Sequence, residues 1–204
     1  YEYSGAATEA CLSANDIIEQ VEKRLDDLLL VSSKHPSLES FLTEQFVPLW
    51  EKIREYSLGC WPNSSRYDGL RYEYQILSPS DFGFHNALKQ CDKLIFLDFE
   101  YFGWDDPVKL TADFVWHPAM NLSVQDMLYW EESMIEIFSH DSEFEARLYA
   151  GKPLYGMRWA MIVLKKFLSS FVASTQFPLK ANDSCKNDVL DHQLEKAKYY
   201  CKAV

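Results

Sequence analysis

Residues 78–100 read SPSDFGFHNALKQCDKLIFLDFE, and this stretch decides what fold and chemistry we expect. Apolar residues at 87–88 and 94–97 flank a polar segment around Asp92, which predicts two short strands joined by a turn, the second strand buried. A turn centred on Asp92 places Asn86 opposite Asp98 at the open end of the hairpin, with Cβ atoms about 5 Å apart.

Two oxygen-bearing side chains held that close can share one hard cation, and Mg²⁺ keeps its remaining positions for water and phosphate. Asp81 lies five residues before Asn86, on the loop that enters the hairpin. An Asp, an Asn five residues later and an Asp at the end of the next strand form a template for phosphoryl transfer. The alternative is that Asp81 and Asn86 are turn or cap residues and that Asp98 merely ends a strand.

Helical periodicity dominates the rest of the chain. It predicts helices from Ser13, across 38–53 with a break or restart at Pro48, over 123–138, from Pro153 to Phe171, and over 189–197. A further extended segment is expected at 72–77. The predicted fold class is therefore α+β and mainly helical.

The chain has 204 residues, 48% of them hydrophobic and 15% aromatic, which is typical of a globular domain. A net charge of −11 argues against nucleic acid or an anionic membrane as the main partner. Five scattered cysteines suit neither a disulfide framework nor a zinc site, and no stretch is apolar enough to span a bilayer. A cytoplasmic location follows as the expectation.

The motif Ser80-Asp81-x-x-x-x-Asn86, followed by Phe96-Leu97-Asp98-Phe99-Glu100, resembles the aminoglycoside phosphotransferase and choline kinase-like family. The segment 104–107 (WDDP) is similar to a Gly-Asp-Pro element of that family. The resemblance implies a small-molecule kinase: Asp81 as catalytic base, Asn86 and Asp98 as Mg²⁺ ligands, and a structural Asp106. Two positions depart from the family pattern: Pro79 replaces a His, and Leu110 replaces an Asp for which Asp113 can substitute.

The resemblance also implies a domain organisation. Residues 1–12 resemble the hinge strand and linker between two lobes, where backbone groups near Glu2 and Tyr3 hold the adenine of ATP. Residues 13–204 then form the helical C-terminal lobe of a protein-kinase-like fold. The sequence has no glycine-rich phosphate loop and no strand Lys, so we expect the N-terminal nucleotide-binding lobe to lie outside this chain and the isolated lobe to be inactive.

Several further residues are candidates for the substrate site. Glu100 and Asp105, together with Glu131 and Glu132, can form an acidic wall for a cationic or polyhydroxyl substrate, although a solvated face explains each of them too. Trp104 can line the same pocket. His85 is expected to form hydrogen bonds, and His117, before Pro118, to end a helix rather than to bind metal.

The sequence thus predicts ATP- and Mg²⁺-dependent phosphoryl transfer to a hydroxyl of a sugar, aminoglycoside or amino alcohol. Two alternatives stay open. One is a non-catalytic kinase-fold module that binds a partner or ligand. The other is a helical hydrolase that uses Asp81 and Asp98 as paired carboxylates.

Overall fold

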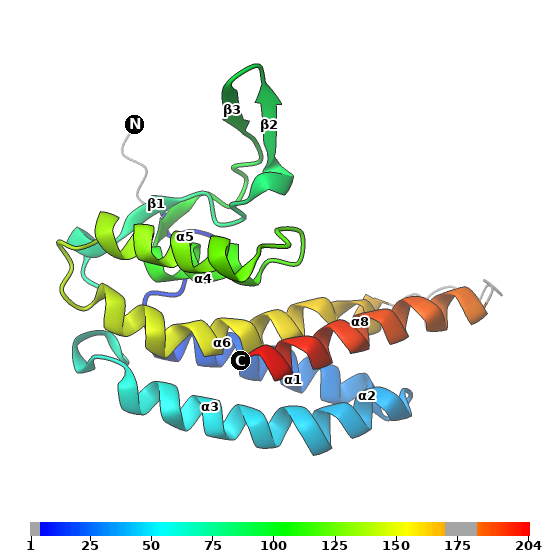
Figure 1. The fold of residues 1–204 in the computed structure, drawn as a ribbon. Coiled ribbons are helices and arrows are strands. Elements are labelled where there is room, and N and C mark those ends of the chain that lie inside the picture. Colours follow the sequence, from blue (N-terminus) through cyan, green and yellow to red (C-terminus); the bar gives the residue numbers. More distant parts are fainter. Residues whose placement is uncertain (1–4, 170–182) are drawn as a thin grey trace. The chain divides into compact units, whose positions relative to one another are not determined.

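The computed structural model describes residues 5–169 and 183–204. Helices make up most of it, and four short strands form two separate two-stranded antiparallel sheets (Figure 1). The predicted fold class, α+β and mainly helical, is confirmed. The described chain divides into two compact units, Tyr1–Ile17 with Ser57–Tyr155, and Ile18–Tyr56 with Gly156–Val204.

The described residues of the second unit form helices joined by short connections and contain no strand. Its elements are most of α1 (Ala14–Ser32) and α3 (Val47–Cys60), α2 (Pro36–Ser40), a π-helical segment (Phe41–Phe46), the end of α6 (Phe144–Val163), and α8 (Asp183–Ala203). Helix α1 buries an apolar stripe at a spacing of three and four residues: Ile18, Val21, Leu25 and Leu28. The Arg158 guanidinium donates to Gln20 Oε1 at 2.8 Å and so joins α6 to α1.

The predicted start of the first helix is confirmed, whereas the last helix, predicted over 189–197, spans Asp183–Ala203. Ser13 and Asp16 cap α1 reciprocally: the Asp16 amide donates to Ser13 Oγ (3.1 Å), and the Ser13 amide to Asp16 Oδ2 (2.9 Å). Pro48 does not end its helix, because the π-helical segment before it passes directly into α3. A wider turn suits a residue that has no amide hydrogen to donate.

The first unit contains both sheets. Strand β1 (Ile76–Ser78) pairs with β4 (Gly103–Asp105), and residues Gly5 and Ala7 bond to Trp104 on the other side of β4. Ala6 forms a parallel bridge with Trp104. This approach requires Gly103, since a Cβ there would lie 2.3 Å from the Ala7 nitrogen. The predicted extended segment at 72–77 is strand only from Ile76, because Tyr72–Tyr74 forms a 3-10 turn.

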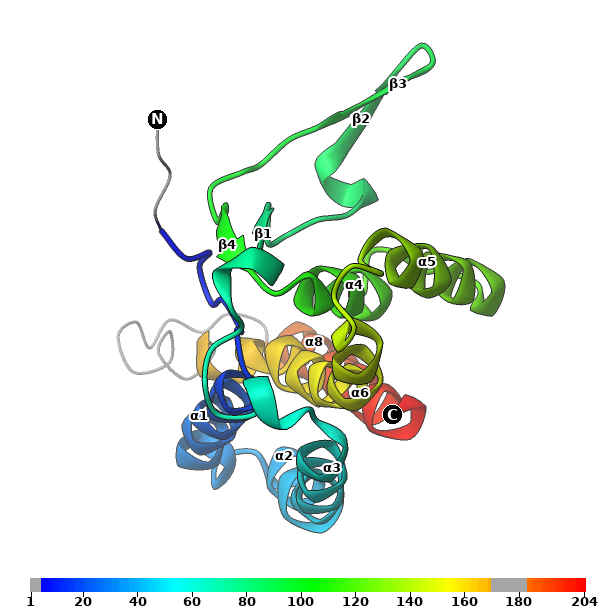
Figure 2. The same cartoon turned by 90° about the vertical axis from the view of Figure 1, so that its left-hand side faces the viewer.

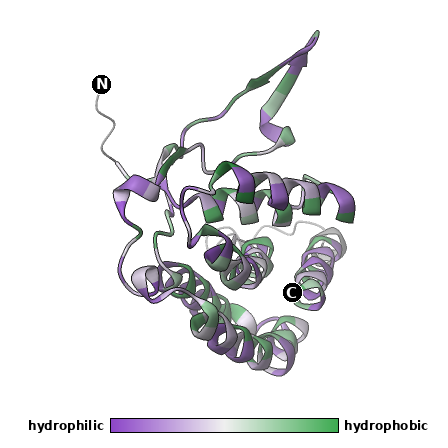
Figure 3. Ribbon diagram, turned by 60° about the vertical axis from the view of Figure 1, so that its left-hand side comes forward, coloured by the Kyte–Doolittle hydropathy of each residue, from purple (hydrophilic) through white to green (hydrophobic). Residues whose placement is uncertain are grey.

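The second sheet is the predicted hairpin, formed by β2 (Ala87–Gln90) and β3 (Lys93–Phe96). It extends away from β1, β4 and the helices of its unit (Figures 1 and 2). The prediction that the second strand is buried is wrong: hydrophobic residues lie along the hairpin, and Leu94 and Ile95 are exposed (Figure 3). Phe96 at the end of β3 is half-buried against the Phe82 ring, whereas Leu88 on β2 is exposed like Leu94 and Ile95.

Three helices complete this unit: α4 (Pro107–Trp116), α5 (Val124–Ile137) and the first part of α6. Ser123 and Asp126 form the predicted capping box of α5. The prediction that a helix opens at Pro153 is wrong, because α6 begins nine residues earlier at Phe144 and contains the proline. Phe144 and Leu148 are fully buried, so packing stabilises the turns that precede Pro153.

A buried ion network fixes the start of α4. Asp106 caps the helix by accepting from the Val108 amide (2.9 Å), and it also accepts two hydrogen bonds from Arg147 (3.0 and 3.1 Å). Asp141 pairs with the same guanidinium at 2.8 Å. Burial alone would lower the pKa of Arg147, but the two carboxylates raise it, so the guanidinium stays charged. Asp106 therefore has the structural role expected of it.

Replacing Arg147 by Met should destabilise the protein by about 3–5 kcal/mol, because two buried carboxylates lose their partner. Urea denaturation followed by circular dichroism measures the change. Arg54→Met is the matched control, since it breaks a half-exposed pair with Glu22 and should cost at most about 1 kcal/mol. Equal destabilisation by both substitutions would contradict this account of the network.

Candidate active site

A strained turn opens the loop that carries Asp81. The Asp81 amide donates to the Pro79 carbonyl at 2.8 Å, which closes a three-residue turn centred on Ser80. Ser80 has a φ of 66°, in the left-handed region that residues other than glycine rarely occupy. Backbone strain of this kind gathers at functional sites. The strained turn therefore makes the following residue, Asp81, a candidate functional residue.

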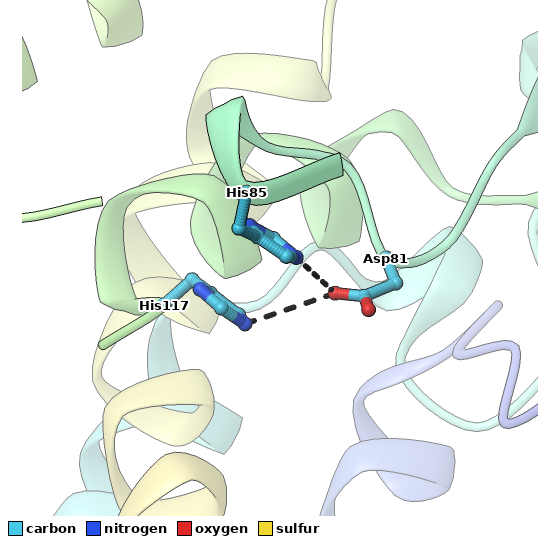
Figure 4. Close-up of side chains that lie close together, drawn as sticks. All are labelled: Asp81, His85 and His117. Atoms are coloured by element: carbon cyan, nitrogen blue, oxygen red, sulfur yellow. Dashed lines mark hydrogen bonds and ion pairs between the residues drawn. The ribbon is translucent and has the colours of Figure 1, made fainter. Parts of the chain in front are cut away.

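Three side chains surround the Asp81 carboxylate. His85 Nε2 lies 3.1 Å from Oδ1, and His117 Nε2 lies 3.7 Å from the same oxygen (Figure 4). Asn86 Nδ2 donates to Oδ2 at 3.2 Å and to the Asp81 carbonyl at 2.9 Å. The structure thus brings Asp81 and Asn86 together within one loop. The contact with His117 joins this loop to the end of α4.

The two imidazoles stack against each other, with ring centroids 4.1 Å apart and ring planes 4° from parallel. The Ala119 amide donates to His117 Nδ1 at 3.2 Å, so the proton of the neutral ring is on Nε2, facing Asp81. His85 likewise presents Nε2 to the carboxylate. Both rings therefore direct an N–H toward Oδ1.

His117 ends α4 as predicted, with its amide donating to the Asp113 carbonyl. Its position beside Asp81 was missed, because no sequence spacing relates residues 36 positions apart. Burial lowers the pKa of His117 and the neighbouring His85 lowers it further, while Asp81 and Asp113 oppose the shift. The ring therefore remains neutral at a lower pH than an exposed histidine.

Gly83 makes room for the His85 ring. A Cβ at Gly83 would lie 2.6 Å from His85 Nδ1 and 2.8 Å from Met120 Sδ, both too close for van der Waals contact. The lack of a side chain at position 83 is thus a condition for the histidine stack. Glycine is required here for space, since its φ of 175° is open to any residue.

Phe82 anchors the loop in an aromatic cluster. Its ring lies 4.9 Å from Phe96 of β3, 5.8 Å from Phe114 of α4 and 6.3 Å from Trp130 of α5, measured between centroids. Phe114 and Trp130 stack at 4.1 Å. The residue after Asp81 is thus held by three different elements of the first unit, which limits the movement of the carboxylate.

The predicted pairing of Asn86 with Asp98 is wrong by one residue. Ala87 pairs with Phe96 and the Leu97 amide donates to the Asn86 carbonyl, so Asn86 lies opposite Leu97. The hairpin turn has two residues, Cys91 and Asp92, with Cys91 at a φ of 54°. A one-residue change of register reverses the face to which a side chain points.

Asp98 nevertheless stays near the loop. It is exposed, with a φ of 61°, and forms no hydrogen bond or ion pair with any described residue. Glu100 raises the pKa of the Tyr101 hydroxyl through a hydrogen bond and its charge, and the charges of Asp98 and Asp81 add to the rise. Carboxylates from both ends of the motif thus act on one phenol.

The residues predicted to contact substrate lie in different settings. Glu100 is exposed beside Tyr101, and the Trp104 ring lies 4.5 Å from Tyr72. Asp105 requires a correction: it is fully buried, and its Oδ1 accepts from the amides of Cys11 and Asp106. A carboxylate so enclosed stabilises the fold and cannot contact a substrate.

Glu131, another residue of the predicted acidic wall, is likewise unsuited to contact a substrate. Glu131 is buried and pairs with Lys152 at 2.5 Å, whereas Glu132 is exposed. The predicted adenine-binding residues Glu2 and Tyr3 lie outside the described residues. Of residues 1–12, predicted to form the hinge and linker, residues 5–12 are described, and the Gly5 carbonyl accepts from the Trp104 amide.

Two sets of groups carry ligand atoms for a cation. The first is Asn86 and Asp98, which have the hard oxygen donors that Mg²⁺ prefers, although the hairpin register places Leu97 rather than Asp98 opposite Asn86. The other set is Asp81, His85 and His117, whose ligand atoms lie within 4.8 Å of one another. Lone pairs of parallel stacked rings do not converge, so one histidine would have to turn to share an ion.

Comparisons of this chain with models of protein families, with curated proteins and with solved structures each found no match. None of the helices in residues 5–169 and 183–204 combines the length and apolar composition needed to cross a membrane.

The depressed pKa of His117 has a consequence for stability. Below the unfolded-state value of 6.5, the unfolded chain takes up a proton that the native ring resists, so the free energy of unfolding should fall as pH drops from about 7 toward 5. His117→Gln should remove this part of the pH dependence. Urea denaturation of both proteins at several pH values measures the difference, and parallel profiles would contradict the assignment.

Proposed function

We propose that this chain is the catalytic and substrate-binding lobe of a kinase-like enzyme that transfers the γ-phosphoryl group of ATP to a hydroxyl of a small molecule. One observation carries the proposal: Asp81 and Asn86 contact each other at 3.2 Å on a single loop. Strand β3 of the hairpin then returns beside Asn86 and leads into Asp98. The kinase template for phosphoryl transfer has a base, then an Asn and an Asp as oxygen ligands for the metal, in this order along the chain.

The resemblance to the aminoglycoside phosphotransferase and choline kinase-like family supports the same proposal. Its motif residues Asp81, Asn86 and Asp98 are all present, and Asp106 lies in the buried ion network that fixes α4. The buried position of Asp105 reduces the proposed substrate contacts to Glu100 and Trp104. An acidic and an aromatic side chain are contacts that suit a cationic or polyhydroxyl acceptor.

In the proposed reaction, Asp81 orients the acceptor hydroxyl and takes its proton as the oxygen attacks phosphorus, while the bond from the γ-phosphorus to the bridging oxygen breaks and ADP leaves. His85 and His117 direct their N–H groups at Oδ1 and Asn86 donates to Oδ2, so Oδ2 keeps a second lone pair that can accept from the hydroxyl. Mg²⁺, held by Asn86 Oδ1 and Asp98, would offset phosphate charge.

The histidine stack supports this role for Asp81 by holding its carboxylate in one orientation. Both rings direct N–H groups at Oδ1, and His117 is itself fixed by the Ala119 amide at the end of α4. Positioning contributes a large share of the rate in reactions of this type, so a fixed carboxylate is an advantage.

Asp81→Asn in the full-length protein should lower kcat by about 10²–10⁴-fold, because it removes the proton acceptor. The measurement is Mg²⁺-dependent ADP release with a panel of sugars, aminoglycosides and amino alcohols. Asp92→Asn is the matched control, since Asp92 lies exposed in the hairpin turn. Equal rates for wild type and Asp81→Asn would remove Asp81 from the mechanism, and a wild type inactive with all acceptors would favour the non-catalytic binding module.

Asp98→Asn should raise the Mg²⁺ concentration that gives half-maximal activity. Substituting a residue that hydrogen-bonds to a metal ligand typically lowers metal affinity by about 10–100-fold. Substituting a direct ligand should have at least as large an effect. Binding of Mn²⁺, followed by electron paramagnetic resonance in the presence of a nucleotide, tests the same point without turnover. Unchanged Mn²⁺ affinity relative to Asp92→Asn would exclude Asp98 as a ligand.

A further inference from the structure

The turn before Asp81 is held in place from outside the loop. Ser80, at its centre, adopts a φ of 66°, and its hydroxyl lies 3.3 Å from Lys109 Nζ and 3.4 Å from the Thr8 carbonyl. A hydroxyl has one hydrogen to donate and two lone pairs, so it can donate to Thr8 and accept from Lys109 at once. The Ser80 amide in turn donates to Ser78 Oγ at 3.1 Å.

Lys109 is an unusual neighbour for such a turn, because it is almost completely buried, with 3% of its surface exposed. A charge is expensive to bury unless it is paired. Lys109 Nζ lies 3.4 Å from Asp105 Oδ2 and 3.2 Å from Asp113 Oδ2, one helical turn to either side. The three residues lie on one face of the segment that starts α4.

The carboxylate of Asp105 is itself immobile, since its Oδ1 accepts from the amides of Cys11 and Asp106. Burial raises the pKa of Asp105, and the charge of Lys109 with these two hydrogen bonds opposes the rise. Lys109 is thus paired with a carboxylate that is itself held by two amides, and it also contacts Ser80, the residue directly before Asp81.

We infer that Lys109 is a positioning residue: through the Ser80 hydroxyl it holds the strained turn that sets the direction of the Asp81 carboxylate. This inference rests on the proposed function. It also explains how the loop is supported although Pro79, two residues before Asp81, has no side-chain donor. Lys109 does not act on the substrate; it acts through Ser80 and the backbone of Asp81.

Ser80→Ala removes the hydroxyl through which Lys109 holds the turn, and Ser80→Gly also relieves the backbone strain at this position. We expect both substitutions to lower kcat of the full-length protein at least tenfold with little change in KM, because substrate binding does not need the contact. Ser133→Ala is the matched control, since within the described part of the chain the Ser133 hydroxyl bonds to the Tyr129 carbonyl on α5 alone. Wild-type kcat in Ser80→Gly would overturn the inference.

A measurement without turnover separates this inference from the proposed function. Hydrogen exchange of the Asp81 amide, which donates to Pro79, should accelerate about tenfold or more in Ser80→Ala and in Lys109→Met, but not in Ser133→Ala. If Lys109→Met does not fold, the exchange rate of the Asp81 amide in Ser80→Ala is the deciding measurement. Unchanged exchange would reject the positioning role, whereas accelerated exchange with an active Asp81→Asn enzyme would retain it and reject the proposed mechanism.

Ser80→Ala in an Asp81→Asn background gives the last control. If the contact acts only through the Asp81 carboxylate, the double variant should be no slower than Asp81→Asn alone. A further tenfold loss in the double variant would mean that Ser80 acts elsewhere, and would contradict the inference.

Discussion

The first unit depends on the carboxylate of Asp106, which caps a helix and forms an ion pair at the same time. This carboxylate accepts from the buried Val108 amide in the first turn of α4 and, through Arg147, connects that helix to α6. Because the pair is fully buried, neither group has water as an alternative partner. The direction of α4 follows from this junction, and with it the positions of both Lys109 and His117, which lie near its two ends.

Helix α4 thereby supports the Asp81 loop at two points. Near its start, Lys109 reaches the Ser80 turn, and at its end His117 stacks on His85 and faces Asp81. Between them, Phe114 packs against Phe82. A short loop with a non-glycine residue in the left-handed region needs such outside support, since its own hydrogen bonds are few.

Local patterns in the sequence predicted the elements better than the contacts between them. The capping pairs Ser13–Asp16 and Ser123–Asp126, and the hairpin itself, follow from short-range spacing. The register was missed because Cys91 gives no sign of a left-handed turn residue, where Asn or Gly would have. The start of α6 was missed because Pro153 is a strong local signal that distant packing outweighs.

The candidate site shows the same division. Asp81 and Asn86 lie close because five residues of one loop join them, and this was predictable. The position of His117 beside Asp81 and the contact of Lys109 with Ser80 both depend on where α4 packs. No local sequence pattern predicts that packing. The Asp105–Lys109–Asp113 spacing was visible as a helical ion-pair pattern, but its burial and its neighbour were not.

The open edges of the β2–β3 hairpin affect how this chain behaves in concentrated solution. Each strand pairs only with the other, so two rows of backbone amides and carbonyls are left without strand partners, beside the exposed side chains of Leu88 and Leu94. Lys89 and Lys93 near the tip place like charges on any second hairpin that approaches. Screening by salt weakens that repulsion, so self-association through this hairpin should increase with ionic strength.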